Sequence, residues 1–225
     1  MALTNLTELK SAIADEIHVD DALNTRLEDF IRRAEAKLNR RLRLREQEQL
    51  LEIDYPVTTT DRFLTLPARF LELLSMASKW AGKPDGYYRN MRFVPPADIV
   101  RYYSISRSRP THFTLRSTVE LNTLPDVDYT LRMHYLQGWD LVTDGSNWLL
   151  TNFPDVYLYG ALYEATAHIQ DDKRLIVWKS AFEQALQEAE LHAQRSRDDA
   201  TLSTSELARI SHSGYAGYNI YTDEV

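Results

Sequence analysis

The 225-residue sequence contains no cysteine and only seven glycines. Without cysteine the chain has no disulfides, thiolate nucleophiles or thiolate metal ligands, although this says little about its compartment. The few glycines form neither a phosphate-binding Gly-rich loop nor a Gly-x-Ser-x-Gly nucleophile motif. The commonest sequence signals of nucleotide binding and of serine or cysteine hydrolysis are therefore missing.

Long apolar runs are also missing. No stretch approaches the length of a membrane-spanning helix, and the N-terminus lacks a basic region followed by an apolar run, so we expect neither a membrane span nor a signal peptide. Acidic residues outnumber basic ones by 33 to 26, which gives a formal charge of −7. This sign disfavours a protein whose whole surface binds nucleic acid. We expect a soluble protein made inside the cell, in which any nucleic-acid contact is local.

Four helices are predicted from apolar residues that recur every three or four positions and form one stripe on each helix. The first begins near residue 5 and the second near residue 21, each after a polar capping residue. The third begins near Pro154, which suits the first turn of a helix, with Asn152 or Thr151 as its cap. The fourth begins near residue 172, so that the last two form an antiparallel hairpin.

The middle of the chain differs in residue composition from the helical segments. Seven of the eight prolines lie between Gln49 and Trp139, among runs of β-branched and aromatic residues at 113–116, 118–121 and 129–135. In the last run Thr130, Arg132 and His134 alternate with apolar residues, which is typical of a strand with one buried face. We therefore predict a small antiparallel sheet between the second and third helices.

These elements predict an α+β fold. It consists of an antiparallel four-helix bundle core, an inserted small antiparallel β-subdomain and an extended C-terminal arm. The expected segments are the N-terminal helices of the bundle at 1–48, the β-rich insertion at 49–145, the C-terminal helical hairpin at 146–196 and the arm at 197–225.

The stretch NWLLTNFPDVYLYGALYEA (147–165) resembles the region before the C-terminal arm of bacteriophage head-to-tail adaptor, or connector, proteins. These are the rings that dock under the portal in podovirus-like phages and gene transfer agents. Further similarities follow in the expected order and cover roughly residues 6–195. They are FIRRAEAKLNRRLRLR (30–45), LTLPARFLELLSM (64–76) and YTLRMHYLQGW (129–139).

The resemblance implies a structural virion protein rather than an enzyme. Such a protein is assembled in the host bacterial cytoplasm and lies at the neck between capsid and tail. It forms a ring, twelvefold in the resembled family, that joins the portal to the tail and continues the DNA channel. The implied partners are the portal, further copies of the chain, tail or nozzle proteins, and DNA passing through the lumen.

The segment after residue 196 is rich in Ser, Thr, Gly and Asp but keeps large apolar and aromatic side chains. Tyrosine combines a broad contact area with a hydroxyl group, which suits a segment that orders on a partner. A strap packed on its own domain is the alternative, and the resemblance favours an arm that docks on the portal. Its candidate anchors are Leu207, Ile210, Tyr215, Tyr218, Ile220 and Tyr221.

Residues 31–45 carry seven basic side chains and one acidic side chain, Glu35. On a helix, four of these cations share one face away from the apolar stripe. Three interpretations stay open: a solvated face, a contact with the acidic surface of a neighbouring subunit, or a phosphate contact with DNA in the lumen. The last is the least favoured, because dense arginines would hold the phosphates that a conduit must release. This basic face consists of Arg33, Lys37, Arg40 and Arg41.

The six histidines show no pair at the spacing of a metal-binding helix, although His112 and His134 can approach each other across a sheet. His168 is the best isolated acid–base candidate, but the aspartates after it are better explained as helix caps. We therefore expect no catalytic, cofactor or metal site. Two alternative functions stay open: a DNA-binding regulatory protein that uses the basic helix 31–45, and, less favoured, a tail-associated cell-wall hydrolase.

Overall fold

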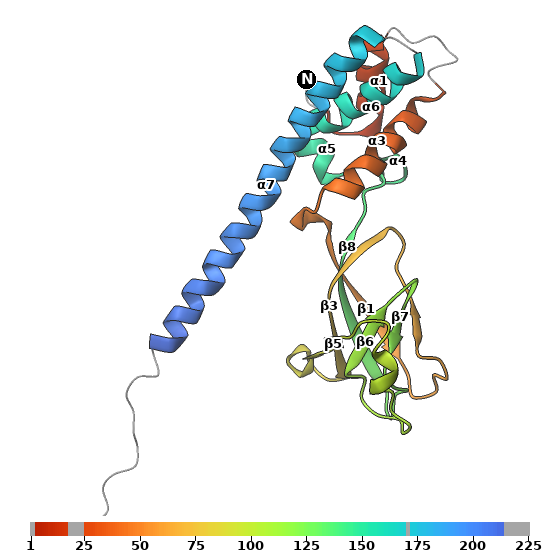
Figure 1. Ribbon diagram of the computed structural model, residues 1–225, viewed down its shortest axis with the longest axis vertical. Helices are drawn as coiled ribbons and strands as arrows, with labels where there is room; N and C mark the ends of the chain where they lie inside the picture. Colours follow the sequence, from red (N-terminus) through yellow and green to blue (C-terminus); the bar gives the residue numbers. More distant parts are fainter. Residues whose placement is uncertain (1–2, 18–24, 170–171, 214–225) are drawn as a thin grey trace, which may run out of the picture. The chain divides into compact units, whose positions relative to one another are not determined.

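Figure 1 shows the computed structural model of the chain. It describes the backbone of residues 3–17, 25–169 and 172–213, and their side chains except at 167–169, 172 and 196–213. The described residues form two compact units. A helical unit combines the residues up to Arg45 with those from Asp140 onward, and a β unit consists of Glu46–Trp139.

The helical unit begins with a helix whose predicted start is confirmed. The Asn5 side chain accepts a hydrogen bond from the Glu8 N–H at 3.0 Å, and the Glu8 carboxylate accepts one from the Thr4 N–H at 2.7 Å. This reciprocal arrangement resembles a capping box, which satisfies backbone donors that the first helical turn leaves unpaired. The α-helices described in this unit are α1 (Leu6–Ile17), α3 (Leu27–Arg41), α4 (Leu141–Asp144), α5 (Trp148–Asn152), α6 (Pro154–Ile169) and α7 (Asp172–Ser213).

The third predicted helix begins at Pro154, as expected, but its predicted cap is wrong. Asn152 and Thr151 belong to the short helix α5, which the apolar periodicity did not indicate. Asn147 caps that helix by accepting a hydrogen bond from the Leu150 N–H at 2.8 Å.

The predicted four-helix bundle core is also wrong. In a four-helix bundle each helix presents one stripe to a shared core, whereas here α6 is the central element against which α1, α3, α5 and α7 all pack. The helix has buried side chains around most of its circumference, so the single stripe predicted for it is incorrect. Its buried apolar residues are Val156, Tyr157, Ala161, Leu162 and Ala165.

The predicted antiparallel hairpin of α6 and α7 is confirmed. Tyr159 stacks on Trp178 with ring centroids 5.9 Å apart, and Phe182 lies directly beside Gly160. The predicted extended arm is wrong for residues 197–213, because α7 continues unbroken to Ser213. Its 42 residues correspond to about 63 Å, and the 16 residues of α6 to about 24 Å.

The β unit holds two sheets of four strands. The first sheet has the strand order β1 (Glu48–Tyr55), β8 (Tyr129–Gln137), β3 (Phe70–Trp80) and β4 (Arg89–Asn90). Each strand in it is antiparallel to its neighbours. The second sheet has the order β2 (Phe63–Thr65), β7 (Thr118–Leu121), β6 (His112–Leu115) and β5 (Arg92–Phe93), with β5 parallel to β6. Three 3₁₀ helices are η1 (Arg45–Gln47), η2 (Asp85–Tyr87) and η3 (Ile99–Tyr102).

These sheets replace the predicted small antiparallel sheet, because they are substantial and share a hydrophobic core of their own. The alternation predicted for β8 is confirmed from Leu131 to His134: Leu131 and Met133 are fully buried, while Arg132 and His134 remain partly exposed. Thr130, which was expected on the exposed face, is buried. Each sheet contributes large side chains to the core. The buried cluster consists of Tyr55, Leu64, Met76, Met91, Phe113, Val119, Leu121, Tyr129, Leu131, Met133 and Tyr135.

Candidate interaction surfaces

The predicted basic face lies on α3, but its four cations have different surroundings. Lys37 forms an ion pair with Glu164 of α6, and its ammonium lies 4.3 Å from the centre of the Tyr163 ring. Arg41 bonds two carboxylates of α7, Glu183 at 2.7 Å and Glu190 at 3.1 Å. Hydrogen bonding to Glu183 is the main cause that raises the pKa of the Arg41 guanidinium. Two cations of the face therefore hold α3 against the helical hairpin.

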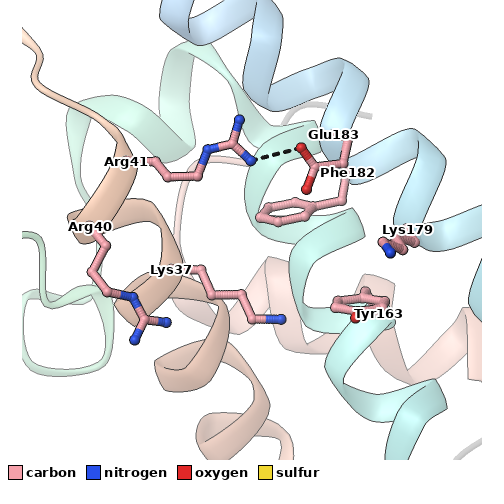
Figure 2. Close-up of a pocket in the computed structure, with 7 residues that line it drawn as sticks. All are labelled: Lys37, Arg40, Arg41, Tyr163, Lys179, Phe182 and Glu183. Atoms are coloured by element: carbon pink, nitrogen blue, oxygen red, sulfur yellow. Dashed lines mark hydrogen bonds and ion pairs between the residues drawn. The ribbon is translucent and has the colours of Figure 1, made fainter.

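The side chains around Lys37 and Arg41 enclose a pocket of about 260 Å³ between α3, α6 and α7, which we call the basic pocket (Figure 2). Four cations line it against a single carboxylate, Glu183. Within the described part of the chain, neither Arg40 nor Lys179 has an ion-pair partner, so the pocket keeps an excess of positive charge. It is lined by Lys37, Arg40, Arg41, Tyr163, Lys179, Phe182 and Glu183.

Arg33 does not join this pocket. Its side chain is exposed on α3, and it has no ion-pair partner among the described residues. The structure instead brings in Lys179 of α7, which lies far from α3 in the sequence and was not among the predicted site residues. No local pattern in the sequence indicates this residue, because only the packing of α7 on α6 brings it to α3.

The predicted arm anchors are placed in part. The backbones of Leu207 and Ile210 belong to α7, and their side chains lie outside the described part of the chain. The four remaining anchors also lie outside the described residues; they are Tyr215, Tyr218, Ile220 and Tyr221.

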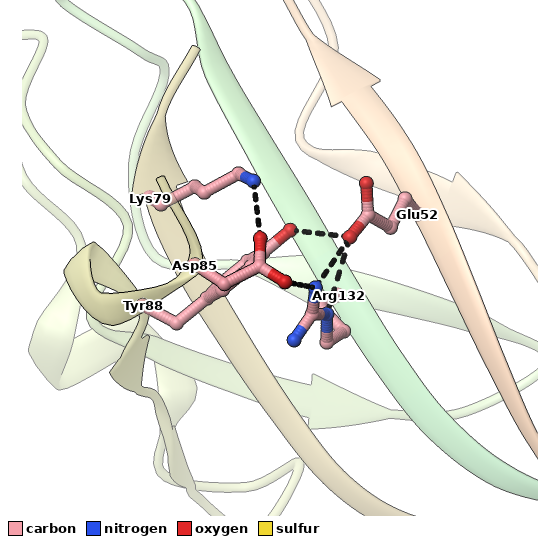
Figure 3. A network of polar contacts seen from close by, with 5 residues as sticks. All are labelled: Glu52, Lys79, Asp85, Tyr88 and Arg132. Carbon is pink, nitrogen blue, oxygen red and sulfur yellow. Dashed lines mark hydrogen bonds and ion pairs between the residues drawn. The ribbon is translucent and has the colours of Figure 1, made fainter. Parts of the chain in front are cut away.

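A polar network covers the outer face of the first sheet (Figure 3). Arg132 of β8 bonds Glu52 of β1 at 2.7 Å and Asp85 of η2 at 2.9 Å, while Lys79 of β3 bonds Asp85 at 2.9 Å. Tyr88 donates a hydrogen bond to Glu52 at 2.9 Å. The centre of the Tyr88 ring lies 4.0 Å from Cζ of the Arg132 guanidinium. The network fixes the segment around η2 to three neighbouring strands.

The ionisation of this network follows from its hydrogen bonds. Bonds from Arg132 are the largest cause that lowers the pKa of both the Glu52 and the Asp85 carboxyl groups. Hydrogen bonding to Asp85 likewise raises the pKa of Lys79. Both carboxylates therefore stay charged at neutral pH, and the arrangement is an ion-pair clamp rather than an acid–base pair.

Glu35 is the most buried carboxyl group of α3, with 4% of its surface exposed. It accepts hydrogen bonds from the Tyr157 hydroxyl at 2.7 Å and from the Leu141 N–H at 2.8 Å, and Asn147 donates to the same hydroxyl at 2.8 Å. Burial raises the pKa of Glu35 and also that of Tyr157. The carboxyl group joins α3 directly to α4 and α6, and Tyr157 connects it to Asn147 at the start of α5. The place of Glu35 in an apolar stripe was the signal that the sequence offered.

The two histidines that the sequence pairs, His112 and His134, lie on different sheets. His112 belongs to the second sheet and stacks on Tyr102 at 4.5 Å, whereas His134 belongs to the first sheet and bonds Glu48 at 3.0 Å. The approach of these two histidines across one sheet is therefore wrong, and the side chain of His168 lies outside the description. Among the residues that the structure describes, no group of three or more His, Asp or Glu side chains is placed to hold a metal ion.

In the same described part, no helix is long and apolar enough to cross a membrane. No curated protein matches the sequence. The family model of the SU10 adaptor protein, in contrast, matches residues 4–207 and thus spans both structural units. The chain therefore belongs to the SU10 adaptor protein family, and it is a structural adaptor protein of the bacteriophage virion.

Proposed function

We propose that this adaptor forms a ring at the neck of the virion, between the portal and the tail. The ring joins the two assemblies and continues the channel through which DNA leaves the capsid. Twelve copies, as in the head-to-tail adaptors that the sequence resembles, give the ring its symmetry. The family match over residues 4–207 is the observation that carries the proposal.

The length of α7 supports a docking role for the C-terminal segment. Helix α6, its partner in the hairpin, is less than half as long. Packing against α6 therefore accounts for only the first part of α7, and a helix gains most of its stability from such packing. The remaining part, with the segment after Ser213, is the region we assign to the portal.

Electron microscopy of the purified chain mixed with its portal tests the ring. We expect rings of the adaptor seated coaxially under the portal. Rings that never form, with the portal intact, would contradict the proposed function.

Two truncated chains test the docking segment. A chain that ends at residue 196 lacks the distal part of α7 and the predicted anchors. We expect it to lose portal binding while its remaining helices still unfold cooperatively when followed by circular dichroism. A chain that ends at residue 213 separates the helix from the tyrosine-bearing end. Unchanged portal affinity of the shorter chain would show that the docking surface lies elsewhere.

A further inference from the structure

We infer that the basic pocket of one copy binds an acidic surface on α1 and α6 of the next copy in the ring. This inference rests on the proposed ring and specifies which surfaces join its subunits. It starts from the excess charge of the basic pocket, because Lys37 and Arg41 already have carboxylate partners but Arg40 and Lys179 have none among the described residues.

A surface of the opposite charge lies elsewhere on the helical unit. It surrounds a second pocket, of about 300 Å³, which three carboxylates line and no cation does. Asp15, Glu16 and Asp155 are all exposed, and none of them has a side-chain ion pair within the described part of the chain. This acidic surface is lined by Leu3, Ala12, Asp15, Glu16, Pro154, Asp155 and Leu158.

The two surfaces lie on different faces of α6. Leu158 contributes to the acidic surface and Tyr163 to the basic pocket. Five residues separate them, which corresponds to a rotation of about 140° around the helix. A copy that presents its basic pocket to a neighbour therefore keeps its acidic surface free for the copy on its other side. Such head-to-tail contacts generate a closed ring when the rotation per subunit divides the circle.

The lining favours a protein carboxylate over a phosphate group as the occupant. Tyr163 and Phe182 form apolar walls of the basic pocket, which suit an occupant that carries apolar groups beside its negative charges. The acidic surface offers apolar groups, among them Pro154 and Leu158, beside its carboxylates. Arginine binds carboxylates through two parallel hydrogen bonds, and long Lys and Arg side chains reach outward from a shallow pocket.

Charge reversal tests this contact on the full-length chain. The variant R40E/K179E reverses two cations that lack ion pairs among the described residues. The variant D15K/E16K reverses two carboxylates in the last turn of α1, where the helix dipole favours cations. We expect each variant alone to require a protein concentration at least about tenfold higher than the wild type for ring assembly. The reason is that like charges then face each other across the subunit contact. The control variant is R33E, which reverses a cation of α3 that does not line the pocket. This variant should assemble normally.

Mixing the two variants gives the decisive measurement. In a ring of alternating variants, the reversed pocket of one variant meets the reversed acidic surface of the other, and their two unchanged surfaces meet each other. An equimolar mixture should therefore assemble as the wild type does. Mass photometry and electron microscopy with the portal report the assemblies. If the single variants assemble normally, or if the mixture fails to recover, the inference is wrong while the ring itself stands. A wild-type chain that forms no ring on its portal overturns both proposals.

Discussion

Glu35 shows how a single residue connects several helices. The carboxyl group accepts two hydrogen bonds, from the Tyr157 hydroxyl and the Leu141 N–H, in a site that water hardly reaches. Removing it leaves both donors without an acceptor, and a buried donor without a partner costs about 1–3 kcal/mol. Because two donors are affected, we expect Glu35→Ala to lower the free energy of unfolding by about 2–6 kcal/mol in urea titrations.

The raised pKa of Glu35 also predicts a dependence of stability on pH. Because the folded chain holds this proton more tightly than the unfolded chain, the free energy of unfolding falls as pH rises from about 4.5 to the pKa of the folded state. Glu35→Gln keeps an acceptor oxygen and removes the titration, so the difference between variant and wild type should change over this pH range. An identical pH profile for both proteins would argue against a protonated Glu35.

At the scale of elements, Gly160 allows α6 to approach two other helices. A β-carbon at this position would lie 3.0 Å from the Phe182 ring of α7 and 3.1 Å from the Ala34 side chain of α3. Both neighbours are buried in the helical unit and have little room to move. The glycine therefore sets how closely the three helices pack.

We expect Gly160→Ala to destabilise the chain despite the better helix propensity of alanine. Overpacking costs about 1–3 kcal/mol, which exceeds the gain of about 0.5–1 kcal/mol from replacing a helical glycine. Thermal unfolding followed by circular dichroism measures the difference. The matched control is Gly86→Ala, because a β-carbon there meets no atom within 4 Å. A stabilised Gly160→Ala chain would show that Phe182 moves aside freely.

Sequence patterns predicted the elements unevenly, for physical reasons. The capping residue Asn5 and the first-turn Pro154 act within one helical turn, so the starts of α1 and α6 were predictable. Strand β3 was not, since its sequence FLELLSMASKW lacks β-branched residues and pairing with β8 holds it in place. The buried residues around α6 were misread as a single stripe, because the number of helices that pack against α6 does not follow from its own sequence.

The candidate site was predictable in the same partial way. Lys37, Arg40 and Arg41 lie within two turns of one helix, so their proximity follows from the sequence. Lys179 and Glu183 come from α7, and the sequence does not show that α7 lies against α3. Tertiary packing therefore decides which cations are paired and which remain available.

At the scale of the whole molecule, the β unit has a hydrophobic core whose members all lie within residues 46–139. We therefore expect the isolated segment 46–139 to fold and to unfold cooperatively. Near-ultraviolet circular dichroism and urea titration measure this. Met133→Ala removes a fully buried side chain of this core and should cost the segment about 2–5 kcal/mol. A segment without fixed aromatic signals would mean that this core is insufficient by itself.

The unbroken course of α7 has a consequence for how the chain tolerates changes in length. Each residue of a helix advances the backbone by about 1.5 Å and rotates it by about 100°. The helical backbone of α7 thus sets the position and the direction of the helix end at Ser213. Deleting one residue from the distal part of α7 turns this end by more than a quarter turn, whereas deleting seven nearly restores the direction and shortens the helix by about 10 Å.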